Sequence, residues 1–110
     1  MNRYFVRPKA DQDPNDQAYY YATQASQALG HRFLIAAHDT FALLATQPEM
    51  GWRPRMRMQG RGLEGLRVFR VRGFERIMIL YRPHAGGVDI LRIVHGSRNL
   101  LSFLRREGLE

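Results

Sequence analysis

The sequence predicts an α+β fold in which two helices pack on one side of a small antiparallel sheet. Three observations support this prediction: an aromatic and β-branched run at residues 4–6, an apolar helical repeat across residues 27–46, and three strand-like apolar runs between residues 66 and 94. At 110 residues and 45% hydrophobic content, the chain has the length and composition of one folded domain. We therefore expect residues 1–110 to form a single domain.

The N-terminal elements are expected to be a strand and a first helix. Residues 4–6 are typical of a strand, and Pro8 ends it. Asp13 and Pro14 then offer a helix N-cap and a proline suited to the first helical turn. A first helix is therefore predicted over about residues 14–25.

Residues 27–46 carry the clearest helical periodicity in the chain and predict a second helix, which completes a two-helix hairpin. Pro48 and Gly51 end this helix. His31 and His38 fall on nearly the same face, but two helical turns separate them by roughly 10 Å, which is too far for a shared metal ion. We interpret both histidines as surface or rim residues. The apolar face of the helix comprises Leu34, Ala37, Phe41 and Leu44.

The last third of the chain predicts a three-stranded antiparallel meander. Residues 66–71 alternate imperfectly, residues 77–81 are apolar on both faces like a central strand, and residues 88–94 form the third strand. Gly73 and the segment 83–87 turn the chain between them. Consecutive strands joined by short turns are expected to pair antiparallel.

The segment between the second helix and the meander is rich in arginine and glycine. Residues 51–65 contain four arginines, four glycines and one proline, a composition typical of an exposed loop. The segment is either a solvated connection or a docking surface for an anion, and the sequence favours neither. Its most basic part spans Arg53 to Arg61.

Charge is distributed unevenly along the chain. Lys and Arg total 17 against 10 acidic residues, a net charge of +7. Residues 1–50 hold four basic and five acidic residues, whereas residues 51–110 hold thirteen basic residues, all of them Arg, and five acidic ones. A GC-rich genome would explain a preference for Arg over Lys, but it would not explain this asymmetry. The C-terminal half therefore predicts an anionic partner, either nucleic acid or an acidic protein.

Several functional classes are disfavoured by composition. The chain has no cysteine, so neither a disulfide framework nor a thiolate metal site is expected. No stretch approaches the roughly 20 apolar residues of a membrane span, and the first residues lack the apolar run of a secretory signal, so a cytoplasmic location is expected. No glycine-rich phosphate loop precedes a helix, which disfavours nucleotide binding of the P-loop or Rossmann kind. No metal or cofactor is expected.

The order strand, helix, helix and three strands, together with three segments of the last third, resembles a known family. The segments are LRVF at 66–69, ILYR at 79–82 and GVDILRIVHGSRNL at 87–100. Their joint order and spacing are similar to the RelE/ParE superfamily of toxins from bacterial type II toxin–antitoxin modules, and most similar to its ParE branch. The resemblance covers about residues 33–101, while residues 1–30 match only in the order of elements. Asn99 stands where the branch commonly has Asp.

The resemblance implies a small cytoplasmic toxin that a cognate, acidic, ParD-like antitoxin holds inactive. ParE-type toxins act on DNA gyrase, whereas RelE-type toxins cut mRNA at the ribosome. The leading expectation is a ParE-like toxin that inhibits gyrase by binding and needs no catalysis. The alternatives are a ribosome-dependent mRNA endonuclease and a degenerate toxin that retains only antitoxin binding.

The endonuclease alternative names specific residues, because metal-free RNA cleavage needs a general base, a general acid and cations near the phosphate. Glu64 or Glu75 could serve as the base. His95 could act as acid or base, with Tyr81 as a further candidate. The expected phosphate clamps are Arg67, Arg82 and Arg98.

Binding to an anionic target calls on an overlapping set of residues in the strands and the segment after them. In a purely structural interpretation, the arginine stems cover apolar surface and the His95 ring bonds a backbone carbonyl at a strand end. Their number on adjoining strands nonetheless favours one electropositive face. The candidate target-binding residues are Arg67, Arg82, Arg92, His95 and Arg98.

Overall fold

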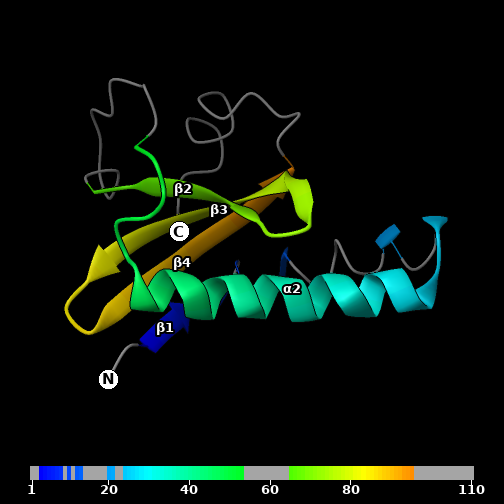
Figure 1. Cartoon of the computed structure of the whole chain (residues 1–110), viewed down its shortest axis with the longest axis horizontal. Coiled ribbons are helices and arrows are strands. Elements are labelled where there is room, and N and C mark those ends of the chain that lie inside the picture. Colours follow the sequence, from blue (N-terminus) through cyan, green and yellow to red (C-terminus); the bar gives the residue numbers. More distant parts are fainter. Residues whose placement is uncertain are drawn as a thin grey trace.

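A four-stranded mixed sheet with one long helix across it forms the body of the protein (Figure 1). The computed structural model describes residues 3–8, 10, 12–13, 20–21, 24–53 and 65–95. The predicted α+β class is confirmed. The elements are β1 (Arg3–Val6), α2 (Gln27–Thr46), β2 (Arg67–Val71), β3 (Phe74–His84) and β4 (Gly87–His95).

The strands β2, β3 and β4 follow one another antiparallel, as the sequence predicts. Gly73 and Gly86 adopt positive φ angles of 85° in the two connecting turns, a conformation that glycine reaches without steric cost. β3 extends to His84, so the second turn is shorter than the predicted segment 83–87. A register shift between Leu80 and Tyr81 places a bulge in the β3–β4 pair.

The expectation of a purely antiparallel sheet is wrong, because β1 joins the same sheet in the parallel direction. The strand order is β1-β4-β3-β2, and β1 pairs parallel to β4 from Arg3 opposite Gly87 to Val6 opposite Ile90. A Cβ at Gly87 would overlap the backbone of Arg3, so glycine permits this close approach. Pairing between the two ends of a chain leaves no local pattern, and this explains why sequence reasoning missed it.

The helix α2 has the bounds that its periodicity predicts. The Ser26 hydroxyl caps its start by accepting a hydrogen bond from the Leu29 amide at 3.0 Å, and Pro48 follows its last residues. The predicted first helix falls largely on residues 14–19 and 22–23, which lie outside the described residues. Of the expected two-helix hairpin, the structure therefore describes the second helix.

The core lies between α2 and the sheet. One face of the helix is fully buried, including Phe33, Ala37, Phe41 and Leu44, whereas Leu34 lies half-buried at its edge. Burying a Phe or Leu side chain contributes about 1.5–3 kcal/mol, so this face supplies much of the folding free energy. The strand residues packed in the same core are Val71, Ile77, Ile79, Tyr81, Val88, Ile90 and Ile93.

The sheet is buried on its second face as well. Side chains of a strand alternate between faces, and the residues that alternate with the core set are also buried: Leu66, Val68, Leu80, Leu91 and Val94. β3 is therefore a central strand with two apolar faces, as residues 77–81 predict.

Candidate functional site

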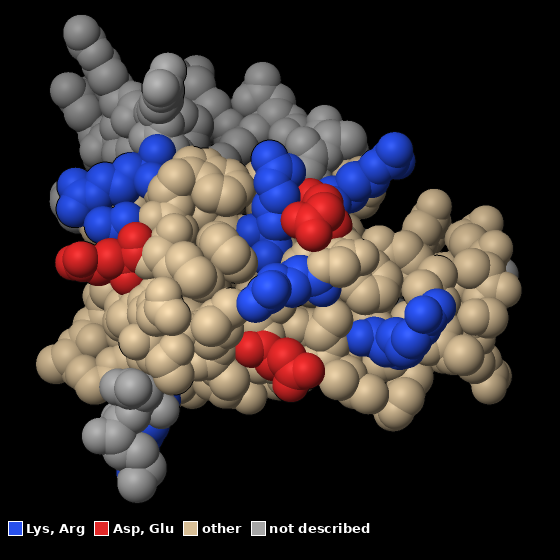
Figure 2. All heavy atoms as spheres, in the orientation of Figure 1, with Lys and Arg blue, Asp and Glu red and all other residues tan. Residues whose placement is uncertain are grey.

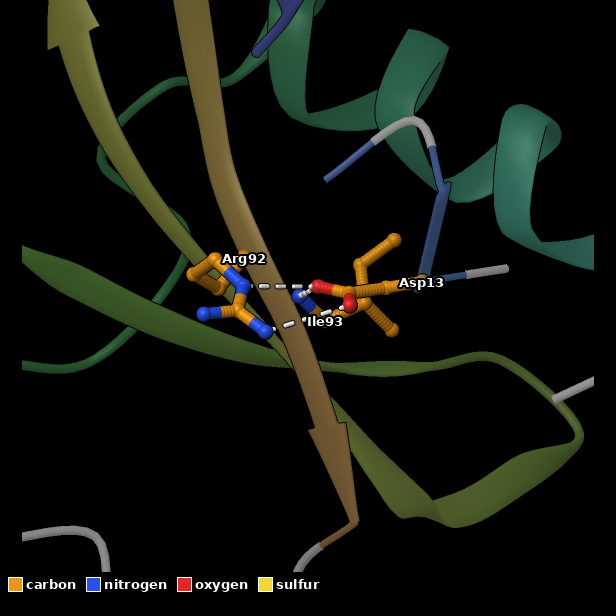
Figure 3. A network of polar contacts seen from close by, with 3 residues as sticks. All are labelled: Asp13, Arg92 and Ile93. Atoms are coloured by element: carbon orange, nitrogen blue, oxygen red, sulfur yellow. Dashed lines mark hydrogen bonds and ion pairs between the residues drawn. The ribbon is translucent and has the colours of Figure 1, made fainter. Parts of the chain in front are cut away.

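Arg92 is paired within the protein. Its Nε lies 2.9 Å from Oδ2 of Asp13 and its Nη2 lies 3.2 Å from Oδ1, a bidentate contact between two side chains that are only 12% and 14% exposed (Figure 3). The Ile93 amide donates to the same Oδ2 at 2.9 Å. Asp13, the predicted helix N-cap residue, neutralises the guanidinium and takes the place of a strand partner where β1 no longer pairs with β4.

Arg67 and Tyr81 hold the chain that follows α2. The Tyr81 hydroxyl donates to the Pro48 carbonyl oxygen and accepts from the Gly51 amide, both at 2.8 Å. The Arg67 guanidinium donates to the carbonyl oxygens of Glu49 and Gly51 at 3.1 and 2.7 Å. Neither side chain is presented to solvent as an open reactive group, since Tyr81 is fully buried and Arg67 half-buried.

The surroundings of Tyr81 set both its chemistry and its neighbours. Burial raises the pKa of the Tyr81 hydroxyl above 10.0, while the hydrogen bond from Gly51 and the charge of Arg67 lower it. A Cβ at Gly51 would lie 2.5 Å from the hydroxyl and 2.7 Å from the Val68 carbonyl oxygen, so only glycine fits there. The hydroxyl therefore stays protonated at neutral pH and holds the segment after α2 against β3.

The remaining candidates are spread over the sheet. Arg82 lies opposite Asp89 in the β3–β4 register, and His95 lies opposite Ile77 at the end of β4; both are half-buried. Arg98 lies outside the described residues, as does Glu64. Because alternation places Arg67 and Arg82 on opposite faces of the sheet, the structure does not bring the predicted set together in one cluster.

A cluster of charged and aromatic side chains at the β1 edge of the sheet was not predicted from the sequence. The Asp89 carboxylate lies 3.4 Å from Nε2 of His84 and 3.7 Å from Nη2 of Arg7, and the Phe5 ring lies 5.2 Å from the His84 ring. These contacts join β1 to the β3–β4 hairpin. The Asp89 charge is thereby engaged with basic neighbours on the protein itself.

A second unanticipated feature combines Trp52 and Arg70. Trp52 forms an isolated antiparallel bridge with Val68, with backbone hydrogen bonds of 2.9 and 2.8 Å, and so extends the sheet beyond β2. The Arg70 guanidinium carbon lies 5.3 Å from the centre of the Trp52 ring, and Trp52 is 42% exposed. Arg53, the next residue, is also exposed. We call Trp52, Arg53 and Arg70 the Trp52–Arg70 surface.

Other exposed basic side chains lie on different elements: Arg32 on α2, Arg72 in the β2–β3 turn and Arg76 on β3. Figure 2 shows basic side chains at separate places on the face that it presents, with acidic side chains between them. The charge on this face is dispersed, so a local arrangement of side chains, and not net charge alone, has to define a binding site.

The described residues contain no group of three or more His, Asp or Glu side chains placed to hold a metal ion. In the same part of the chain, no helix is long and apolar enough to cross a membrane.

Comparisons with known proteins are consistent with this fold. The sequence model of a family described as "ParE toxin of type II toxin-antitoxin system, parDE" matches residues 4–100. Among solved structures, the chain is similar to one titled "Chromosomal ParDE TA system from P. aeruginosa", with a TM-score of 0.65 and 16% sequence identity, covering 86% of this chain and 96% of that one. Comparison with curated proteins yields no match. Because the family match extends over most of its residues, the chain belongs to the ParE toxin family of type II toxin–antitoxin systems.

Proposed function

We propose that the protein is a cytoplasmic toxin that inhibits DNA gyrase by binding to it, and that a cognate antitoxin neutralises this activity. Membership of the ParE family supports the toxin assignment. The observation that carries the choice of binding over catalysis is the pair of hydrogen bonds made by the Tyr81 hydroxyl, because they engage one of the candidate acids for RNA cleavage within the fold.

A general acid must reach the proton acceptor on its substrate within hydrogen-bond distance. The Tyr81 hydroxyl already makes two hydrogen bonds within the fold and is fully buried, so contact with RNA would require removal of the segment around Gly51. Arg67, a proposed phosphate clamp, is committed to two carbonyl oxygens of that segment. Inhibition by surface contact needs no such rearrangement and is therefore the better-supported mechanism.

The antitoxin is proposed to be acidic. The similar solved structure is titled as a ParDE toxin–antitoxin system, and we extend the pairing of a toxin with an antitoxin to this chain. With a net charge of +7, the toxin would attract a negatively charged partner and accelerate its association. Such a partner is expected to be encoded beside this chain and to copurify with it.

Two assays test the mechanism side by side. Purified toxin is added to gyrase with relaxed plasmid, and separately to ribosomes programmed with mRNA. Loss of supercoiling with intact mRNA supports the proposal, and restoration of supercoiling by the adjacent gene product supports neutralisation. Cleaved mRNA with unaffected supercoiling would replace the proposal by the endonuclease alternative, for which replacing His95 by Gln should nearly abolish cleavage. No effect in either assay, with antitoxin binding intact, would indicate a degenerate toxin.

A further inference from the structure

We propose that the Trp52–Arg70 surface is a docking site for a carboxylate-bearing segment of the antitoxin. This inference rests on the proposed function for the existence of that partner. It locates one contact on the toxin and specifies its chemistry: a carboxylate on the Arg70 guanidinium, and the neighbouring part of the segment against the Trp52 ring.

The Trp52 side chain takes no part in the hydrogen bonds that hold this residue in the sheet. Trp52 joins the sheet through its backbone, by two hydrogen bonds with Val68 that any residue except proline could make. Its ring lies outside the core and is 42% exposed. A partly exposed tryptophan ring offers a partner a large apolar contact area together with a polar N–H group.

The Arg70 guanidinium is held in place before any partner arrives. It packs against the Trp52 ring at 5.3 Å, and its Nη1 donates to the Glu75 carbonyl oxygen at 3.1 Å. This carbonyl is the only hydrogen-bond acceptor found for the Arg70 side chain among the described residues. Its other N–H groups keep their capacity to bind a carboxylate, and the prior ordering reduces the entropy lost on binding.

Position and charge complete the surface. An antiparallel bridge places Trp52 and Val68 on the same face of the sheet, and Arg70 follows two residues along β2 on that face. This is the face opposite α2. Arg53, the next residue along the chain, is exposed as well, whereas the Glu75 carboxylate accepts a hydrogen bond from the Gly73 amide in the β2–β3 turn.

The observations favour an acidic protein segment over a nucleic acid. Single strands bind by stacking successive bases on several aromatic side chains. One side of the Trp52 ring already carries the Arg70 guanidinium. The exposed aromatic Phe5 lies on β1, at the far edge of the four-stranded sheet, and therefore extends no platform from Trp52. Tryptophan and arginine side by side are instead the residues most enriched at the energetic centres of protein interfaces.

The test compares two variants of the surface with a charge-matched control. Trp52→Ala removes the ring, Arg70→Gln removes the charge, and Arg32→Gln removes the same charge from the exposed side of α2. Affinity for the protein encoded beside the toxin is measured by calorimetry, gyrase inhibition is measured in parallel, and thermal melts show that each variant folds. Arg70→Lys keeps the charge without the planar fork and guards against loss of folding in Arg70→Gln.

We expect Trp52→Ala and Arg70→Gln each to weaken antitoxin binding by about 30-fold or more, as befits an interface hot spot, and Arg32→Gln by less than about threefold. The double variant should lose less than the product of the two single losses, because removing the ring also loosens the guanidinium. Arg70→Lys should recover only part of the affinity.

Three results would overturn the inference. The first is antitoxin affinity unchanged in both surface variants. The second is loss of gyrase inhibition with antitoxin binding retained, which would assign the surface to the target. The third is loss of binding to a labelled single-stranded oligonucleotide in place of the antitoxin. Failure of the wild-type toxin to inhibit gyrase would instead count against the proposed function, and the antitoxin measurements would still decide the role of this surface.

Discussion

Replacing Tyr81 by Phe isolates the contribution of one buried hydroxyl. The change keeps the aromatic ring in the core and deletes the two 2.8 Å hydrogen bonds to Gly51 and Pro48. Gly51 is buried, so its amide is left without a partner at a cost of about 1–3 kcal/mol, whereas the half-buried Pro48 carbonyl can reach water and costs about 0.5–1.5 kcal/mol. We expect a total loss of about 2–4 kcal/mol.

Thermal and urea unfolding of purified protein measure this loss. For a domain of this size, 1 kcal/mol corresponds to a shift of about 4 °C, so the melting temperature should fall by about 8–16 °C. Tyr21→Phe is the matched control. Its ring packs against Phe33 and Phe74, but no hydrogen bond of its hydroxyl is found among the described residues, so a change of about 0.5 kcal/mol or less is expected. Equal losses in both variants would refute the structural role assigned to the Tyr81 hydroxyl.

Three further predictions concern the ion pairs of Asp13 and Asp89, the fit of Gly51 against Tyr81, and the titration of Tyr81. Asp13→Asn removes the carboxylate charge that faces the mostly buried Arg92 guanidinium and should destabilise the protein by about 2–4 kcal/mol in urea titrations. Asp89→Asn, at a longer and more exposed ion pair, should cost less than about 1 kcal/mol, and the reverse order would contradict the geometry. Gly51→Ala drives a methyl group against the Tyr81 hydroxyl and should cost about 1–3 kcal/mol, measured by the same titration; an unchanged midpoint would mean that the segment moves freely. The raised pKa of Tyr81 means that the folded state keeps the phenol proton to higher pH than the unfolded state does. The associated stability is therefore complete below pH 10 and is lost as the pH rises through the folded-state pKa. Tyr81→Phe should remove this part of the alkaline loss of stability, and an identical pH profile for the variant would contradict the prediction.

The helix and the antiparallel strands could be predicted because their signals are local. The apolar period of residues 27–46, the cap at Ser26 and the stop at Pro48 lie within the segment that they organise, and α2 has the predicted bounds. Two turn glycines likewise separate three strands whose composition is apolar. The resemblance to the ParE branch drew on these same segments, and the family match confirms it.

The candidate site could be predicted only in part. The sequence pointed to the arginines because several lie on adjoining predicted strands. It did not indicate which of them would be paired with other groups inside the fold. The partner of Arg92 lies 79 residues away in Asp13, and the partners of the Tyr81 hydroxyl lie 30 and 33 residues away. Trp52 was overlooked because a lone tryptophan beside a glycine carries no periodic signal, although its place before an arginine-rich segment could have drawn attention to it.

The amino-acid sequence by itself determined the α+β class, the helix, the order of the strands and the excess of arginine in the second half of the chain. Only the tertiary structure decided that β1 completes the sheet, that Asp13 neutralises Arg92, and that Arg70 lies against an exposed tryptophan. The physical reason is one of range. Periodicity and capping act over a few residues, whereas the charge that a side chain presents depends on neighbours that the fold brings from distant parts of the chain.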